Sequence, residues 1–401
     1  MSIRPALLFY CQHSVGLGHL VRSFAVARAL AERFRVVLLC GGAVPDAVAP
    51  PASVELVTLP ALGVGENGAF ESQDGHDSVQ AARAVRRRLI LDAFRKLRPE
   101  VVLIELFPFG RAKFAPELLP LLEEARGGGA LVACSLRDIL VTGRENQEAH
   151  DERACALANR YFDAVLVHSD PRLVRLEDSF RLRRRLRVPL HYTGFVRPNG
   201  VHRALRRERR IVVSVGGGRV GEPLLHTAAE AYRFLGGDPG VRMRMVAGPF
   251  LPEAGWRRLT ALAAGQEGLE LLRSVPDLGA ELASAAASIS QCGYNTAIEL
   301  LGARVPALVV PYATPEEDEQ TERARRLAAI GVVRSLDPER LDPAALAAGA
   351  RSLLDFQPRL PRLDLDGARG SARVMSALVG GRAGGLAAGP GGARLPEACA
   401  E

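Results

Sequence analysis

The sequence is poor in the features that mark membrane-spanning, disulfide-rich and zinc-binding proteins. No apolar run approaches the roughly 18 residues that a transmembrane helix needs, and the first residues lack a signal-peptide pattern. The six cysteines form no Cys-x-x-Cys pair and have no histidine at ligand spacing, which disfavours disulfides and a zinc site. We therefore expect a soluble, cytoplasmic protein with buried, reduced thiols.

Lysine is scarce, since only Lys96 and Lys113 are present, and arginine supplies nearly all of the positive charge behind the formal net charge of +7. Arginines cluster at 86–88, 183–185, 206–207 and 209–210. Arginine suits phosphate contacts, but such runs are usually solvated helix faces. With no helix-turn-helix, RNA-binding aromatic pair or zinc finger, we expect no nucleic-acid partner. A weak peripheral association with a membrane surface stays open.

Apolar runs alternate with helical patterns along most of the chain. With 401 residues and 48% hydrophobic residues, the chain is long enough for two full cores. In the first half, the predicted strands are 6–10, 35–40, 101–104, 130–134 and 164–167, and the predicted helices are 20–32, 77–97, 115–126 and 145–161. This order predicts an α/β fold with a doubly wound parallel sheet.

The pattern predicts five parts. The first Rossmann-like domain takes 1–195, and the periodicity stops in a polar, arginine-rich linker at 196–209. A second α/β unit at 210–355 opens with the apolar run 211–215 and a glycine loop, and a helical segment follows at 356–379. The glycine-rich tail, 380–401, is expected to be disordered.

The most informative segment is 290–299, where small polar residues precede a helix. Gly293 lets the backbone turn after an apolar run, and the helix is expected to begin near Asn295 or Thr296. The free amides of that first turn and the helix dipole can hold a pyrophosphate without a metal ion. Glu299 lies on the same helix face as Asn295 and can accept hydrogen bonds from ribose hydroxyls. A simpler reading is that Asn295 and Thr296 only cap the helix.

A second polar loop follows the first strand and ends in Gly-x-Gly-His at a helix start. Ligands of open α/β sheets bind at the carboxyl ends of the strands, so Gly18 and His19 are expected to face a cleft. A dinucleotide-binding fingerprint would need a third glycine where Val21 stands, which argues against an NAD enzyme.

Three residues are candidates for a general base. His19 is the first, because a histidine can accept a proton near neutral pH, although it can equally order the loop or contact the donor. His13 is the second. Glu105, at a predicted strand end, is the third, and it can equally be an ion-pair partner of Arg111 or Arg137.

The segments Gly-Tyr-Asn-Thr, Ala-Ile-Glu-Leu, Pro-Ala-Leu-Val-Val-Pro and Glu-Gln-x-x-Arg-Ala between 290 and 327 resemble the donor-binding region of GT-B glycosyltransferases of the MurG-like group. The loop Gly-x-Gly-His-x-x-Arg is also similar to that group. The resemblance implies two Rossmann-like domains facing an interdomain cleft, with the last helix packing back on the first domain. It also implies an inverting, metal-independent transfer of a hexose or N-acetylhexosamine, most simply from a UDP-sugar, to an unidentified hydroxyl acceptor, with no cofactor.

By the same resemblance, the phosphates lie at the glycine loop and at the start of the 294–303 region, the nucleobase near 274–278, and the sugar or ribose hydroxyls at the start of a later helix. The implied donor-binding residues are Gly18, Gly217, Gly218, Arg219, Ser274, Val275, Gly293, Asn295, Thr296, Glu299, Glu319 and Gln320.

The sequence differs from MurG-like proteins at two places that bear on the identity of the acceptor. The opening loop has His13-Ser14-Val15 where MurG-like proteins have a Gly-Thr-Gly character, and the segment 105–122 has no counterpart in them. We therefore do not expect lipid-linked muramyl pentapeptide as acceptor; that segment resembles a group of bacterial predicted glycosyltransferases whose acceptor is not established. A nucleotide-sugar hydrolase of the same fold, with His19 activating water, and a non-catalytic nucleotide-sugar-binding partner protein remain alternatives.

Overall fold

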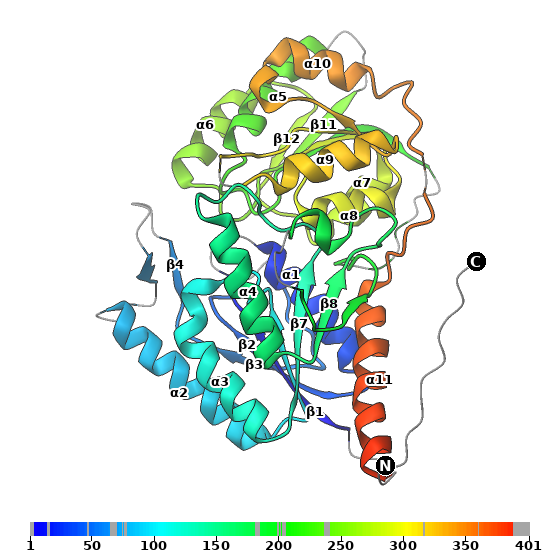
Figure 1. Ribbon diagram of the computed structural model, residues 1–401. Helices are drawn as coiled ribbons and strands as arrows, with labels where there is room; N and C mark the ends of the chain where they lie inside the picture. Colours follow the sequence, from blue (N-terminus) through cyan, green and yellow to red (C-terminus); the bar gives the residue numbers. More distant parts are fainter. Residues whose placement is uncertain are drawn as a thin grey trace, which may run out of the picture.

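Two α/β domains are stacked one above the other, with α1 lying between them in Figure 1. The computed structural model describes residues 4–13, 17–45, 48–64, 70–73, 75, 78–180, 185–198, 200, 202, 206–235, 241–315, 317–359 and 361–387. Within these residues, no helix combines the length and the apolarity needed to cross a bilayer. Part of the opening loop (14–16) and most of 65–77 lie outside the described residues.

The N-terminal domain is built on a parallel sheet in the order β3-β2-β1-β6-β7-β8-β9. Its central strands are apolar on both faces because helices cover both sides of the sheet. A short antiparallel hairpin, β4 with β5, lies apart from it. The strands are β1 (Ala6–Cys11), β2 (Arg35–Cys40), β3 (Glu55–Thr58), β4 (Leu62–Val64), β5 (Phe70–Ser72), β6 (Val101–Glu105), β7 (Leu131–Arg137), β8 (Ala164–His168) and β9 (Leu190–Tyr192).

The helices of this domain are amphipathic and pack in two layers. One buried core contains α2 to α4, and the other contains α1. The helices are α1 (Leu17–Leu30), α2 (Val79–Leu97), α3 (Ala115–Gly127) and α4 (Gln147–Tyr161). The α1 helix begins three residues earlier than expected, which brings Gly18 and His19 into its first turn.

The C-terminal domain repeats the architecture with the parallel order β12-β11-β10-β13-β14-β15. Its strands are β10 (Glu208–Ser214), β11 (Arg242–Val246), β12 (Leu269–Leu272), β13 (Ala285–Ser290), β14 (Ala307–Val309) and β15 (Arg334–Ser335). Its helices are α5 (Glu222–Leu235), α6 (Glu253–Ala263), α7 (Leu278–Ser284), α8 (Tyr294–Ala303), α9 (Glu319–Ala329) and α10 (Pro343–Arg351). Because β10 begins at Glu208, the last two residues of the expected linker, 208 and 209, already belong to a strand.

The chain crosses between the domains twice, and the two crossings touch. Gly194 has a positive φ of 87°, and a Cβ atom there would lie 2.5 Å from the carboxyl carbon of Asp364. The amide of Phe195 donates to the Asp364 carbonyl at 2.8 Å, and that of Gly367 donates to the Phe195 carbonyl at 3.0 Å. Only glycine fits Gly194, because the backbone conformation and the close approach both exclude a side chain.

After the second crossing, α11 (Gly367–Ala387) runs down the side of the N-terminal domain (Figure 1). Its Ala372 and Met375 are buried in the same core as Leu20 and Phe24 of α1. The helix continues eight residues past the expected boundary at 379, so 380–387 are helical and not part of a disordered tail. The remaining tail, 388–401, lies outside the described residues.

Candidate active site

The start of α8 offers backbone amides to a ligand. Gly293, in extended conformation, is the N-cap residue, and no side chain caps the helix there. The first turn of a helix has no internal partner for its amides, so those of Tyr294, Asn295 and Thr296 are available to an anion. The alternative reading, that Asn295 and Thr296 only cap this helix, is therefore wrong. By contrast, the Asp277 side chain does cap α7, accepting a hydrogen bond from the Ala280 amide at 3.1 Å.

A cavity of about 680 Å³ lies between the domains at this helix start. From the C-terminal domain, the predicted residues Ser274, Val275, Asn295, Thr296 and Glu299 line it. The opposite wall was not predicted and is mostly apolar, with Arg28 as a charged member: it comes from α1 and the segment after β2. Its residues are Leu17, Val21, Phe24, Arg28, Val48, Ala49, Pro50, Pro51 and Ala52.

The glycine loop after β10 lines the cavity with a different residue from those expected. Gly216 lines the cavity, whereas Gly217 and Gly218 do not. A Cβ atom at Gly218 would lie 2.4 Å from the Ala247 carbonyl oxygen, so this part of the loop packs on the following strand end. Arg219 is exposed. The loop thus supports the cavity floor mainly through close backbone packing.

Glu299 is 5% exposed and lines the cavity. Burial raises the pKa of its carboxyl to about 7; the charge of Asp277 adds to the shift and that of Arg197 opposes it. A Cβ atom on Gly279 would lie 2.3 Å from Glu299 Oε2, so α7 packs directly on this carboxyl group. Glu299 is therefore held in one place facing the cavity.

Asn295 joins the two domains at the cavity. Its Nδ2 donates a hydrogen bond of 3.1 Å to the carbonyl of Gly18 in the first turn of α1. The predicted donor residue Gly18 thus meets the predicted phosphate residue Asn295 across the cleft. His19 is the next residue of α1, whose Leu17 and Val21 line the cavity.

His19 and Glu105, expected as separate candidates, form one unit. His19 Nδ1 lies 2.7 Å from Glu105 Oε1, and the same oxygen accepts a hydrogen bond of 2.5 Å from Arg22. Glu105 is fully buried, and Arg22 is 2% exposed. Because Nδ1 donates to the carboxylate, His19 Nε2 keeps its lone pair, and it makes no hydrogen bond to a described residue.

The charges of this unit follow from its contacts. Burial lowers the pKa of His19 below its usual value; Glu105 opposes this shift, and the positive charges of Arg111 and Arg22 add to it. Burial would raise the pKa of Glu105, but the contacts with His19 and Arg22 outweigh it and hold that pKa below its usual value. At neutral pH the arrangement is a carboxylate beside a neutral imidazole. Arg22 follows His19 by three residues on the same helix face. Its place in this unit could have been anticipated from that spacing.

His13 is held within its own domain. Its Nε2 contacts the Ala43 carbonyl at 2.9 Å, its Nδ1 contacts the Cys40 thiol at 3.7 Å, and the residue is 5% exposed. With both ring nitrogens engaged, His13 orders the loop after β2, and this geometry favours His19 as the base.

Glu319 and Gln320 make structural contacts next to the cleft. Glu319 forms an ion pair with Arg137 of the N-terminal domain. The side-chain oxygen of Gln320 accepts hydrogen bonds from the amides of Cys292 (3.0 Å) and Tyr312 (3.2 Å). The carboxyl group of Glu319 is thus engaged by Arg137, whereas only the side-chain oxygen of Gln320 is used in these contacts.

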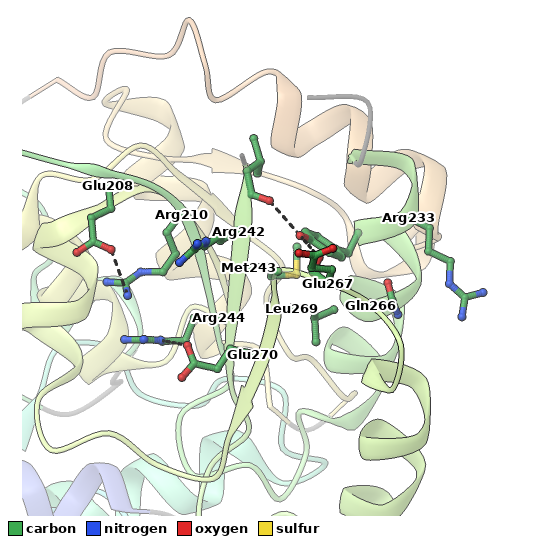
Figure 2. Close-up of a pocket in the computed structure, with 13 residues that line it drawn as sticks. Glu208, Arg210, Arg233, Arg242, Met243, Arg244, Gln266, Glu267, Leu269 and Glu270 are labelled. Atoms are coloured by element: carbon green, nitrogen blue, oxygen red, sulfur yellow. Dashed lines mark hydrogen bonds and ion pairs between the residues drawn. The ribbon is translucent and has the colours of Figure 1, made fainter. Parts of the chain in front are cut away.

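A larger hollow, of about 810 Å³, lies at the amino ends of β10 to β12, away from the cleft. Figure 2 shows two of its arginines beside glutamates: Arg210 contacts Glu208 at 3.4 Å, and Arg244 contacts Glu270 at 2.7 Å. The helix start and the polar loops lie at the opposite ends of the strands, where α/β sheets bind ligands. This hollow is therefore not the candidate active site.

Among the described residues, no three His, Cys, Asp or Glu side chains cluster as a metal site would require. Asp364 and Asp366, separated by Leu365, belong to the second crossing between the domains. Their backbone contacts the first crossing, where Val196 forms an isolated bridge with Asp366 and the Phe195 amide donates to the Asp364 carbonyl.

Comparison with known proteins places this chain among GT-B structures. The Glycosyltransferase family 28 C-terminal domain matches residues 261–364, which include α8 and α9. A UDP-N-acetylglucosamine--N-acetylmuramyl-(pentapeptide) pyrophosphoryl-undecaprenol N-acetylglucosamine transferase of Halorhodospira halophila is 32% identical over 172 residues, 43% of this chain and 47% of that protein. The enzyme of the same name from Methylococcus capsulatus is 29% identical over the same shares. The chain thus spans about half the length of these relatives.

Solved structures match nearly the whole chain. The calicheamicin glycosyltransferase CalG4 has a TM-score of 0.61 at 18% identity, covering 95% of this chain and all of that one. MurG of Acinetobacter baumannii has a TM-score of 0.52 at 16% identity, covering 94% of this chain and 99% of that one. These likenesses confirm the predicted fold of two Rossmann-like domains. The match to the family 28 domain and to the two bacterial transferases confirms the predicted resemblance to MurG-like proteins.

Proposed function

We propose that this protein is an inverting, metal-independent glycosyltransferase that moves a hexose or N-acetylhexosamine from a nucleotide diphosphate sugar to a hydroxyl acceptor. The observation that carries the proposal is the interdomain cavity, which combines the uncapped start of α8, the buried Glu299 and, across the cleft, the α1 helix start that carries His19. The similarity to transferases named for UDP-N-acetylglucosamine supports a UDP-sugar as donor.

The donor would lie along the C-terminal wall of the cavity. The amides at the start of α8 would hold the diphosphate, and the helix dipole would favour its negative charge. Glu299 would accept hydrogen bonds from the ribose hydroxyls, and the backbone around Ser274 and Val275 would contact the nucleobase. Because these groups meet the charge of the leaving diphosphate, the reaction would need no metal ion.

Transfer requires the acceptor hydroxyl to lose its proton as its oxygen attacks the anomeric carbon. In the proposed step, the new bond forms between that oxygen and the anomeric carbon, and the bond to the diphosphate oxygen breaks on the opposite face. His19 Nε2 takes the proton, and the Glu105 carboxylate stabilises the imidazolium through Nδ1–H. Attack opposite the leaving group inverts the anomeric configuration.

Donor binding can be tested by thermal shift with UDP, GDP, dTDP and CMP sugars, because a ligand of the folded state raises the melting temperature. We expect UDP-sugars to give the largest shift and Glu299→Ala to remove it. Glu230→Ala, which changes an exposed glutamate on α5, is the matched control and should keep it. Undiminished UDP affinity in Glu299→Ala would contradict the proposed site.

Turnover measurements distinguish a glycosyltransferase from a hydrolase and from a binding protein. Release of UDP from the donor in the absence of any acceptor, abolished by His19→Ala, would indicate a hydrolase. Donor binding without turnover under either condition, unaffected by His19→Ala, would indicate a binding protein.

A further inference from the structure

A cavity of about 590 Å³ lies where the two crossings between the domains meet the end of α8. It is lined by Arg172 after β8, Arg197 of the first crossing, Arg304 at the end of α8 and residues 361–365 of the second crossing, among others. Among the described residues, this crossing pocket shares no lining residue with the donor cavity. Its volume is in the range of small-molecule sites.

Four arginines line the crossing pocket, and they come from parts of the chain that are far apart in the sequence. They are Arg172, Arg197, Arg304 and Arg362, whereas Asp364 is the one carboxylate among the described lining residues. A run of arginines on one helix is usually a solvated face. Here, four separate segments bring their arginines to one cavity, so the tertiary structure concentrates positive charge at the contact between the crossings.

Two of these four positive charges have a counter-charge within the protein. Arg172 donates two hydrogen bonds to Asp170, at 2.9 Å from Nε and at 2.5 Å from a terminal nitrogen. Asp364 balances one more charge, and its Oδ1 already accepts a hydrogen bond of 2.8 Å from the Asp366 amide. The other arginines form no ion pair with a described residue, so the pocket has an excess of two positive charges.

Arg197 is fixed in place while its guanidinium group has no ion-pair partner among the described residues. A Cβ atom on Gly302 would lie 3.2 Å from Arg197 Cδ, so the stem of the side chain packs on the last turn of α8. Its Nε is buried without a hydrogen-bond partner. The Nε atoms of Arg22, Arg137 and Arg210 are also buried without a partner, but each of these residues pairs with a carboxylate through another nitrogen.

Glu299 does not supply the missing counter-charge. Its side chain lines the donor cavity and not the crossing pocket. Burial, the main cause, and the charge of Asp277 raise the pKa of Glu299 to about 7 against the opposing charge of Arg197, so about half of these carboxyl groups are uncharged at neutral pH. A half-buried guanidinium without a counter-charge is costly unless a ligand supplies one.

We infer that the crossing pocket is a binding site for a phosphate group, either inorganic phosphate or a phosphate monoester. Such a monoester carries about −1.5 to −2 charges at pH 7 and three acceptor oxygens, which match the excess charge and the guanidinium donors of the pocket. A bound phosphate would pair with Arg197 of the first crossing and Arg362 of the second, and so would stabilise the contact between them. This inference goes beyond the proposed function and does not depend on it.

The test is the thermal stabilisation of the protein by inorganic phosphate, and separately by glycerol 3-phosphate, at constant ionic strength and with UDP at saturation to occupy the donor cavity. We expect Arg197→Met to weaken the apparent phosphate affinity about tenfold or more, because hydrogen bonds between charged groups are lost. Arg197→Lys should weaken it less, since a lysine keeps the charge but not the two-pronged geometry. Arg257→Met, which changes an exposed arginine on α6, should leave the affinity unchanged.

A second variant keeps the test decisive if Arg197→Met does not fold. Arg304 and Arg362 are exposed, so the double variant Arg304→Met with Arg362→Met should keep the wild-type melting temperature in the absence of phosphate. We expect it to weaken phosphate binding about tenfold or more as well, since two of the positive charges of the pocket are removed.

Each outcome supports or overturns the site. Saturable stabilisation of the wild type that is weakened in these variants supports it. Tighter binding of glycerol 3-phosphate than of inorganic phosphate then identifies a monoester as the occupant, and comparable binding identifies phosphate itself. No saturable stabilisation of the wild type, equal affinity in wild type and variants, or loss of phosphate binding when UDP is added overturns the inference. If UDP itself does not bind, the proposed donor site fails, whereas arginine-dependent phosphate binding still supports the crossing pocket.

Discussion

Arg323 of α9 and Asp138, the residue after β7, form a buried ion pair that joins the two domains. Arg323 Nε and the second guanidinium nitrogen each donate to one carboxylate oxygen at 2.8 Å, and the side chains are 3% and 1% exposed. The remaining nitrogen donates to the Cys292 carbonyl at 2.8 Å. Although burial opposes it, the Arg323 charge holds the pKa of Asp138 below its usual value. The pair thus connects the loop before α8 to the N-terminal domain.

Removing one partner of this pair should be strongly destabilising. Asp138→Asn leaves the Arg323 charge buried without a counter-charge, and we expect a loss of about 3–5 kcal/mol in the free energy of unfolding. Urea denaturation followed by circular dichroism measures it. Arg95→Gln breaks an exposed pair with Glu124 and should change stability far less. A small effect of Asp138→Asn, similar to that of Arg95→Gln, would show that the pair does not hold the domains together.

His19→Ala should lower turnover while sparing donor affinity. General base catalysis contributes on the order of 10²–10⁴-fold, so kcat should fall by that factor, and the Kd for UDP should stay within about twofold. Initial rates with a UDP-sugar and calorimetry with UDP separate the two effects. His226→Ala, on the outer helix α5, is the matched control and should leave both unchanged. A large loss of UDP affinity in His19→Ala would instead assign His19 to the donor.

Glu299 should make stability depend on pH. Its pKa of about 7 in the folded protein lies above the usual 4.5, so the folded state binds the proton more tightly than the unfolded state. The stabilisation is full below about pH 4.5 and is lost as pH rises through 7, a change of about 3 kcal/mol. Denaturation at pH 5 and pH 8 should show this fall in wild type and a smaller one in Glu299→Gln. Glu230→Gln should retain the wild-type fall, and an identical fall in all three proteins would assign it to other groups.

Asn295→Ala should weaken donor binding modestly. The change removes the hydrogen bond to the Gly18 carbonyl, whose net contribution is about 0.5–1.5 kcal/mol, so the Kd for UDP should rise up to about tenfold. Calorimetry with UDP measures it. Asn146→Ala, which changes an exposed residue, serves as control. An unchanged Kd in Asn295→Ala would mean that the contact between the domains does not shape the donor site.

Several residues that line the interdomain cavity could be predicted because they are local in the sequence. The Gly293-to-Glu299 segment contains its own turn, helix start and carboxylate, and helix periodicity places Asn295 and Glu299 on one face. Glycine patterns were less informative. Gly216, and not Gly217 or Gly218, reaches the cavity, because the packing of the loop on Ala247 decides which residue turns inward.

The sequence by itself determined the alternation of strands and helices, hence two parallel sheets, and the cradle at the start of α8, because these follow from short-range periodicity and turn chemistry. Only the tertiary structure decided which polar groups meet. His19 and Glu105 come together because β1 and β6 are neighbours in the sheet, and Asp138 meets Arg323 because the domains pack against each other. Such pairings depend on strand order and domain contact, which local residue patterns do not encode.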